Sequence, residues 1–389
     1  LGRIVIGKIH NGSIKAGQQA ALLKDDGSIK RGRISKLLGF QGLQRVEVEE
    51  AHAGDLVAIA GFDEVNIGET VACPDNPEAL PLIKVDEPTL QMTFVVNDSP
   101  FAGKEGKFVT SRNIKERLDR ELLHNVALKV EPGESADKFI VSGRGELHLS
   151  VLIETMRREG FEMSVGRPEV VQRIVDGVIE EPYEAVVVDC EEQHQGSVME
   201  ALGLRKGDLK NMVPDGKGRV RLDYIIPARG LIGFRSQFLT LTSGSGIMTH
   251  VFDHYGPVKR AELGGRVNGV LVSMVKGKTL AYALSTLQQR GRLFVDPNKD
   301  VYEGQIVGLH SRGNDLVVNP TKAKQLTNVR ASGTDEALIL TPPVRHSLEQ
   351  ALEFIEDDEL VEVTPDSIRL RKKLLLEHFD SPSVFFDQY

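Results

Sequence analysis

The segment from residue 138 to residue 165 constrains the fold more than any other part of the sequence. It begins with the β-branched and aromatic run KFIV, which stops at the glycine-containing turn SGRG, residues 142 to 145. Apolar residues then recur at the spacing of one helical face, namely Leu149, Leu152, Ile153 and Met156. Gly160 suits the left-handed position that ends a helix, and residues 161 to 165 alternate as in a strand. The pattern predicts a strand, a helix and a second strand.

The two glycines of GRGELH, residues 143 to 148, allow a second interpretation as a phosphate-binding loop. The dinucleotide-binding pattern GxGxxG requires three glycines, because each one serves a different close approach of the backbone. This sequence supplies two of the three. We therefore interpret the glycines as a structural turn between the strand and the helix.

The same order of elements surrounds this segment and then recurs. In the first copy we expect strands at 90–96 and 126–131, with a helix at 111–125 that Ser111 caps. In the second copy the expected elements are strand 183–188, helix 195–205, strands 210–213 and 219–226, helix 231–240 and strand 247–252. The sequence DGKG at 215–218 is typical of the hairpin between the two middle strands. Each copy predicts a ferredoxin-like βαββαβ domain.

The flanking regions have other patterns. Residues 1 to 85 contain many short alternating runs separated by glycine turns, which predicts a small β-barrel. The region from residue 258 mixes strand-like runs with helix-like segments such as LAYALSTLQQ and residues 348 to 355. We therefore predict a multidomain α+β protein with a small β-barrel at 1–85, two ferredoxin-like βαββαβ domains at 86–175 and 176–257, and a mixed α/β C-terminal domain at 258–389.

Composition limits the class of protein. The 389 residues are 40% hydrophobic and contain no run of about eighteen apolar residues, so we expect no membrane span. Two cysteines cannot form a disulfide framework, which favours a cytoplasmic location. The net charge of −8 argues mildly against indiscriminate nucleic-acid binding but says little about local patches. Because the first residue is Leu1, we expect a piece of a longer protein.

Several of these motifs resemble known translation factors. The GxGELH turn, the helix after it and the VGxPxV segment that ends the next strand together resemble the third domain of elongation factor G. The segment GSIKAGQQ resembles the barrel of translational GTPases. EPYEAVVVDCEEQHQGSVMEAL resembles the fifth domain of elongation factor G. Only residues 166 to 180 stand where that factor has its fourth domain, so the resemblance does not imply tRNA translocation. Residues 313 to 337 and the following TPPVRHSLEQALEFIEDDELVEVTP closely resemble the C-terminal domain of the BipA/TypA family.

The sequence contains no complete catalytic motif. The nearest match to a phosphate loop, Gly2 with Gly7-Lys8, continues with Ile9 instead of Ser or Thr, and the base-reading NKxD pattern is absent. We therefore expect this chain not to be an enzyme. The resemblance implies that the full-length parent is a GTPase, with GTP and Mg²⁺ bound only in a domain that precedes these residues and no cofactor within them.

Three histidines and a cysteine leave alternatives open. His250 and His254 have the i, i+4 spacing of a metal pair, but on a strand this spacing spans about 13 Å, so we interpret them as ordinary strand residues. Cys190 and His194 could form a nucleophilic pair, which is the alternative hypothesis of a stand-alone enzyme. A third hypothesis is a regulatory scaffold that binds a protein.

Two basic regions are the candidate RNA-binding sites. The first contains Arg205, Lys206, Lys210, Lys217, Arg219 and Arg221. The second has no acid between residues 315 and 335 and offers Asn319, Thr321, Lys322, Lys324 and Arg330. A basic loop with small polar residues suits contact with phosphates and 2′-OH groups, although composition alone equally allows a solvated loop without a role.

The family resemblance supplies the functional expectation. It implies a ribosome-binding protein whose C-terminal domain reaches toward ribosomal RNA of the large subunit and the A-site tRNA. It further implies roles in ribosome assembly and stress adaptation, and we expect a monomer off the ribosome.

Overall fold

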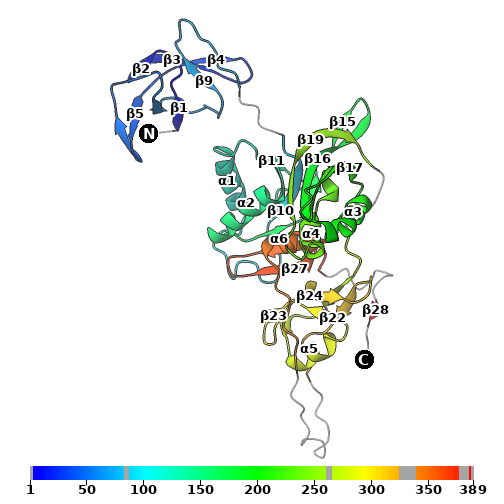
Figure 1. Ribbon diagram of the computed structural model, residues 1–389. Helices are drawn as coiled ribbons and strands as arrows, with labels where there is room; N and C mark the ends of the chain where they lie inside the picture. Colours follow the sequence, from blue (N-terminus) through cyan, green and yellow to red (C-terminus); the bar gives the residue numbers. More distant parts are fainter. Residues whose placement is uncertain (1–2, 83–86, 260–264, 324–338, 376–384, 387–389) are drawn as a thin grey trace, which may run out of the picture. The chain divides into compact units, whose positions relative to one another are not determined.

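The computed structural model describes residues 3–82, 87–259, 265–323, 339–375 and 385–386. The chain forms two compact units (Figure 1), one from Leu1–Val85 with Leu123–Val126 and the other from Asp86–Leu122 with Ala127–Tyr389. No helix in the described ranges is long and apolar enough to cross a membrane.

The first unit is all-β around one apolar core, as predicted for a small barrel. Its strands are β1 (Ile4–Lys8), β2 (Ser13–Lys15), β3 (Gln19–Leu23), β4 (Ile29–Arg33), β5 (Lys36–Gln41), β6 (Gln44–Glu47), β7 (Glu50–His52), β8 (Leu56–Ala60) and β9 (Thr70–Ala72). They pair as β1-β8-β5-β6, β4-β3-β9 and β2-β7. Leu22, Ile34 and Leu37 are among the side chains buried between these sheets. Gly61 follows β8 with φ +125°, where the chain passes close to the Arg33 carbonyl.

The second unit begins with the predicted βαββαβ order. Its elements are β10 (Leu90–Val95), α1 (Ser111–Leu122), β11 (Lys129–Pro132), β12 (Lys138–Gly143), α2 (Glu146–Arg158) and β13 (Met163–Val165). The sheet order β11-β12-β10-β13 is ferredoxin-like. Gly160 ends α2 with φ +98°, as expected. The cap of α1 differs from the prediction, because the Thr110 hydroxyl, not that of Ser111, accepts the Asn113 N–H at 3.3 Å.

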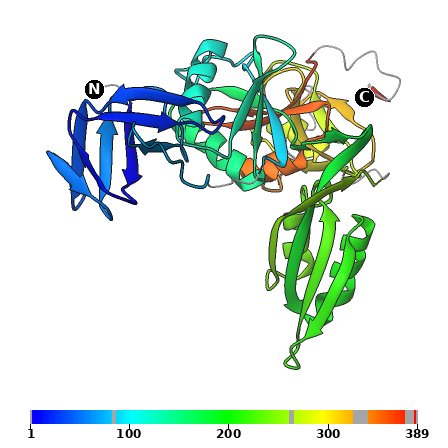
Figure 2. The ribbon, with the colours of Figure 1, turned by 90° about the horizontal axis from the view of Figure 1, so that it is seen from above.

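The second ferredoxin-like domain is also confirmed (Figure 2, green). It consists of β16 (Val178–Glu191), α3 (Gln195–Leu204), β17 (Asp208–Pro214), β18 (Arg219–Pro227), α4 (Phe234–Leu241) and β19 (Ile247–Pro257). Their order is β19-β16-β18-β17, and β15 (Arg173–Val175) forms a hairpin with β16. The second helix starts three residues later than predicted, because residues 228–230 form a 3-10 turn and Gly233 has φ +69°.

The C-terminal region mixes short strands and helices around two clusters of core residues. Its strands are β20 (Val270–Ser273), β21 (Gly277–Lys278), β22 (Gly291–Leu293), β23 (Asp300–Val301), β24 (Gln305–His310), β25 (Leu316–Val318), β26 (Glu359–Val363), β27 (Ile368–Lys372) and β28 (Phe385–Phe386). Its helices are α5 (Ala281–Leu287) and α6 (Leu348–Phe354), and Ser347 caps α6 through a capping box.

This region does not have a sheet separate from the first ferredoxin-like domain, although we expected a boundary between them. β13 pairs with β26, with Met163 opposite Val363, so the sheet continues as β13-β26-β27-β24-β20-β25. Met156 of α2 and Leu352 of α6 belong to the same core cluster. The physical reason is the edge position of β13, since its free backbone groups are satisfied by pairing with another strand. The strand periodicity alone did not show which partner would be chosen.

A buried charge network holds β26 and β27 to the rest of this core. The Glu359 carboxylate is fully buried and accepts two hydrogen bonds from the Arg266 guanidinium, at 2.8 and 3.0 Å. The Lys372 ammonium lies 3.0 Å from the same carboxylate, 2.6 Å from Asp315 and 2.7 Å from Asp358. Burial opposes ionisation of Glu359, but the contacts with Arg266 and Lys372 hold its pKa below the ordinary value.

The N-terminus of α2 lies against the second ferredoxin-like domain and α6. The Glu146 carboxyl there has a buried Oε1 atom without a hydrogen-bond partner. Burial raises the pKa of Glu146 to about 7, helped by the Glu353 and Glu184 carboxylates and opposed by His250 and the Gly233 N–H. A carboxylic acid that resists ionisation therefore lies where α2, α6 and the second ferredoxin-like domain meet.

We expect Glu146 to make the stability of this unit fall as the pH rises. The folded state holds the Glu146 proton up to about pH 7, whereas the unfolded chain loses it near 4.5, so stability is lost across this window. Between about pH 5 and pH 8, the free energy of unfolding of the parent is expected to fall by about 2 kcal/mol relative to that of the Glu146→Gln variant. Urea unfolding of both proteins across this range measures the difference. A difference that does not change with pH would contradict the assignment.

Candidate RNA-binding surfaces

The first candidate surface is the base of the predicted C-terminal loop. β25 leads into residues 319–322, where the Asn319 Oδ1 atom accepts hydrogen bonds from the Thr321 N–H at 3.0 Å and the Thr321 hydroxyl at 2.9 Å. The Pro320 carbonyl accepts the Leu280 N–H at 3.0 Å. Asn319 and Thr321, which we predicted as RNA contacts, therefore satisfy each other and shape the turn. Lys322 follows them with an exposed side chain.

Two lysines that the sequence analysis missed lie beside this turn. A Cβ atom at Gly277 would come within 3.1 Å of the Thr321 side chain, so β21 packs directly against the loop base. Lys276 and Lys278 flank this glycine and are exposed. The tripeptide KGK was visible in the sequence, but only the folded structure brings it next to Lys322. Lys324 and Arg330, two further predicted contacts, lie outside the described residues.

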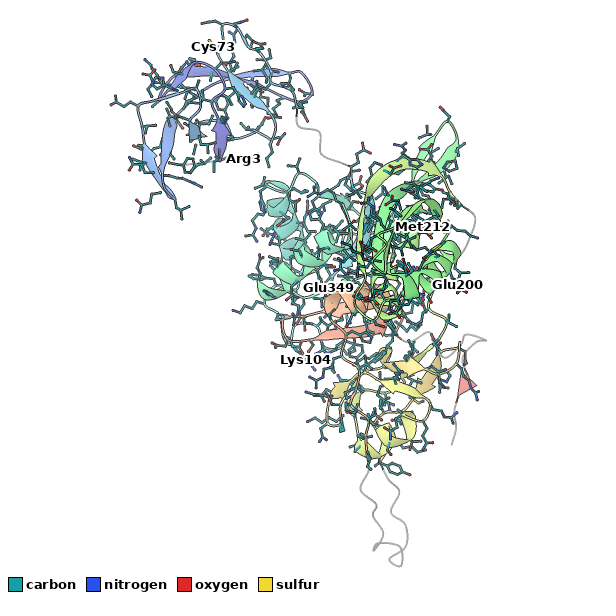
Figure 3. All side chains as sticks on the ribbon, viewed as in Figure 1. Arg3, Cys73, Lys104, Glu200, Met212 and Glu349 are labelled. Atoms are coloured by element: carbon teal, nitrogen blue, oxygen red, sulfur yellow. The ribbon has the colours of Figure 1, made fainter. Side chains whose placement is uncertain are left out.

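The second candidate surface is the β17–β18 hairpin of the second ferredoxin-like domain. β17 is an edge strand, and all seven of its residues are exposed, including Met212 (labelled in Figure 3). The hairpin turn is held by the Asp215 carboxylate, which accepts the N–H groups of Lys217 at 2.7 Å and Arg219 at 3.0 Å. These backbone hydrogen bonds lower the pKa of Asp215. The predicted hairpin is confirmed.

Three of the predicted cations on this surface have partners inside the domain. The Arg205 guanidinium donates to the carbonyls of Gly230 at 2.8 Å and Ile232 at 3.1 Å, and burial lowers its pKa. Arg219 pairs with Asp189, and Arg221 with Asp223 at 3.0 Å. Arg205 and Arg219 therefore contact distant segments of the domain, whereas Arg221 pairs with a neighbour on its own strand and its side chain is 58% exposed. The prediction that these three residues bind RNA stays a prediction, although each guanidinium already has a partner in the domain.

The other three cations remain available. Lys206, Lys210 and Lys217 have exposed side chains, and within the described part of the chain none of them pairs with a carboxylate. Lys206 has a left-handed conformation, φ +64°, two residues after the end of α3. We use the name hairpin lysines for Lys206, Lys210 and Lys217. They offer ammonium groups that can contact phosphates.

The cysteine of the nucleophile hypothesis and the histidines of the metal hypothesis are buried or bonded to other residues. Cys190 is fully buried in the core beneath α3, and burial raises the pKa of its thiol, which disfavours the nucleophilic thiolate. His250 pairs with Glu184, and His254 bonds Asp253 at 2.6 Å while stacking on Tyr183. Among the described residues, no three histidine, cysteine or acidic side chains are grouped as metal ligands.

Models of three protein families match parts of the chain. Residues 2–72 match the model described as elongation factor Tu domain 2, and residues 178–264 match the elongation factor G C-terminus. These two matches place the chain in the class of translation factors. Residues 268–377 match the TypA/BipA C-terminal domain.

Individual relatives agree with this classification. The chain is 61% identical over 378 residues to the large ribosomal subunit assembly factor BipA of Escherichia coli K12, covering 97% of this chain and 62% of the relative. The Haemophilus influenzae protein of the same name is 61% identical, again across 97% of this chain and 61% of the relative. The Synechocystis protein is 58% identical over 372 residues, which are 96% of this chain and 62% of the relative. The chain belongs to the BipA/TypA family.

This finding corrects the expectation that the chain is not an enzyme. That expectation depended on the absence of nucleotide-binding motifs from 389 residues. The chain spans only 62% of the length of the Escherichia coli relative while matching it across 97% of its own. Missing motifs in a sequence that covers three fifths of its relatives do not decide whether the protein is catalytic, so the conclusion is withdrawn.

Proposed function

We propose that this chain is the ribosome-binding part of a BipA/TypA translational GTPase that acts in assembly of the large ribosomal subunit. The name of the relatives supports the assembly role. The observation that carries the RNA-binding part is the pair of exposed lysine groups, the hairpin lysines and the lysines at 276, 278 and 322, on a protein with a net charge of −8. Lysines without carboxylate partners on an acidic protein favour local contact with phosphates.

The finer parts of this proposal follow from the family relation. We propose that the C-terminal loop contacts ribosomal RNA near the A-site tRNA and that contact with the ribosome is coupled to GTP hydrolysis, with Mg²⁺ as the metal. A cytoplasmic monomer that joins the ribosome during assembly and stress adaptation fits this role. Lys324 and Arg330 stay in the proposal as residues of the loop.

Co-sedimentation with ribosomes across a salt series tests the proposal. Replacing Lys322, Lys324 and Arg330 by alanine is expected to reduce the slope of log affinity against log salt by roughly 0.7 to 0.9 for each phosphate that no longer meets a cation. If both surfaces bind RNA, replacing the three hairpin lysines by alanine is expected to reduce this slope by a similar amount for each lysine.

A matched control removes three positive charges elsewhere, at Lys8, Lys107 and Lys115, whose side chains are exposed. This variant should keep the slope of the parent. An equal decrease in all three variants would show a general charge effect instead of two specific surfaces. Ribosome binding that does not respond to salt would favour the scaffold hypothesis.

A further inference from the structure

A pocket of about 560 Å³ lies between the first ferredoxin-like domain and the C-terminal region, both within the second unit. Its walls come from the loop after β10, α2, the segment between β22 and β23, the segment before α6, and β27. A volume of this size is typical of sites for small organic ligands. None of the predicted RNA-binding residues lines it.

The charged residues in the pocket wall have a positive excess. Five cations line it, Lys104, Arg157, Lys299, Arg345 and Arg369, against the three acids Glu105, Asp296 and Asp300. Two of the acids are already neutralised, because Arg345 donates to Asp296 at 3.0 Å and Arg369 pairs with Glu105. Arg157 is paired in turn with Glu154 at 3.1 Å. Lys104 and Lys299 then remain against Asp300, so the pocket keeps a positive excess that favours an anion.

Two lysines carry the charge that remains available to a ligand. Lys104 (labelled in Figure 3) lies with its ammonium 4.2 Å from the Phe101 ring centroid. Lys299 comes from a different segment of the wall, just before β23. Within the described residues, neither ammonium has a carboxylate within ion-pair distance. Exposed lysine side chains can turn toward a bound phosphate at little cost.

The pocket also has an aromatic wall. Phe294 and His346 pack edge to face with centroids 4.6 Å apart, and both line the cavity. Burial lowers the pKa of His346, so the imidazole is neutral at physiological pH and behaves as a polar aromatic ring. An apolar or aromatic part of a ligand would find contact here.

We propose that this pocket binds a small organic phosphate, with the phosphate held by Lys104 and Lys299 and the organic part against Phe294 and His346. The phosphate class follows from two ammonium groups, which bind phosphate as point charges, and the size follows from the cavity volume. Such a ligand would connect the loop after β10 to the segment before β23. The proposal does not depend on ribosome binding.

Isothermal titration of the whole 389-residue chain with AMP, inorganic phosphate and adenosine tests it. AMP is expected to bind with a Kd of about 1 mM or tighter, and adenosine much more weakly. Lys104→Ala/Lys299→Ala is expected to raise the Kd for AMP about tenfold for each ammonium group removed, and Lys104→Arg/Lys299→Arg is expected to restore most of the affinity.

The control variant Lys8→Ala/Lys115→Ala removes the same charge from exposed sites outside the pocket and should bind AMP like the parent. Circular dichroism checks that each variant is folded. The proposal is overturned if neither AMP nor inorganic phosphate binds, if adenosine binds as well as AMP, or if the pocket variant binds like the control. A ten-nucleotide RNA is tested in the same way. If it binds the parent more tightly than AMP does and does not bind the pocket variant, the pocket is a site for RNA and the proposal of a small ligand is overturned.

Discussion

Replacing Glu359 by alanine is expected to destabilise the second unit by about 3 to 5 kcal/mol, because it leaves the buried charges of Lys372 and Arg266 without their shared partner. The Lys372 side chain is 2% exposed and that of Arg266 13% exposed, so water cannot replace the missing carboxylate. Lys372 keeps Asp315 and Asp358, which limits the destabilisation. Native-state hydrogen exchange of the amides in β26 and β27 measures the effect.

Two further variants separate charge from packing. Glu359→Gln keeps the shape and should cost less than alanine while still removing the ion pairs. Glu134→Ala removes a carboxylate whose side chain is 92% exposed, and it should change stability by no more than about 0.5 kcal/mol. The contribution of Glu359 should disappear as the pH falls through its lowered pKa, because protonation then removes the charge. A Glu359→Ala protein as stable as Glu134→Ala would show that the network is not important for stability.

The second large effect is expected at Gly61 in the barrel. An alanine Cβ there would lie 2.1 Å from the Arg33 carbonyl oxygen, a contact with backbone that cannot turn aside. The positive φ of +125° adds strain for any other residue. Clash and strain together should destabilise the barrel by about 3 kcal/mol. Hydrogen exchange of the amides in β8 reports this destabilisation.

Gly7 provides the matched control in the same unit. It lies inside β1, opposite Val57 of β8, and an added Cβ would meet no heavy atom within 4 Å. Gly7→Ala should be neutral or stabilise the barrel by up to about 1 kcal/mol, because it reduces the freedom of the unfolded chain. Equal destabilisation by both substitutions would mean that replacement of a glycine as such, and not the close approach at residue 61, is responsible.

Local sequence patterns determined most of the secondary structure. The 3.6-residue spacing of Leu149, Ile153 and Met156 predicted α2, and DGKG predicted the β17–β18 hairpin, because such patterns depend on neighbours a few residues away. The order βαββαβ followed twice from these local elements. The motif resemblance to the BipA/TypA family was equally a property of the sequence, and the comparisons confirmed it.

The tertiary structure alone decided which residues of the basic run are free. Arg205 and Lys206 are adjacent in the sequence. The Arg205 guanidinium donates hydrogen bonds to the carbonyls of Gly230 and Ile232, whereas the Lys206 side chain is exposed. Likewise, β13 pairs with β26, which lies far away in the sequence. Hydrogen bonds and ion pairs between distant segments depend on how the elements pack. Spacing along the chain cannot reveal them, because charge type and periodicity are local and the choice of partner is not.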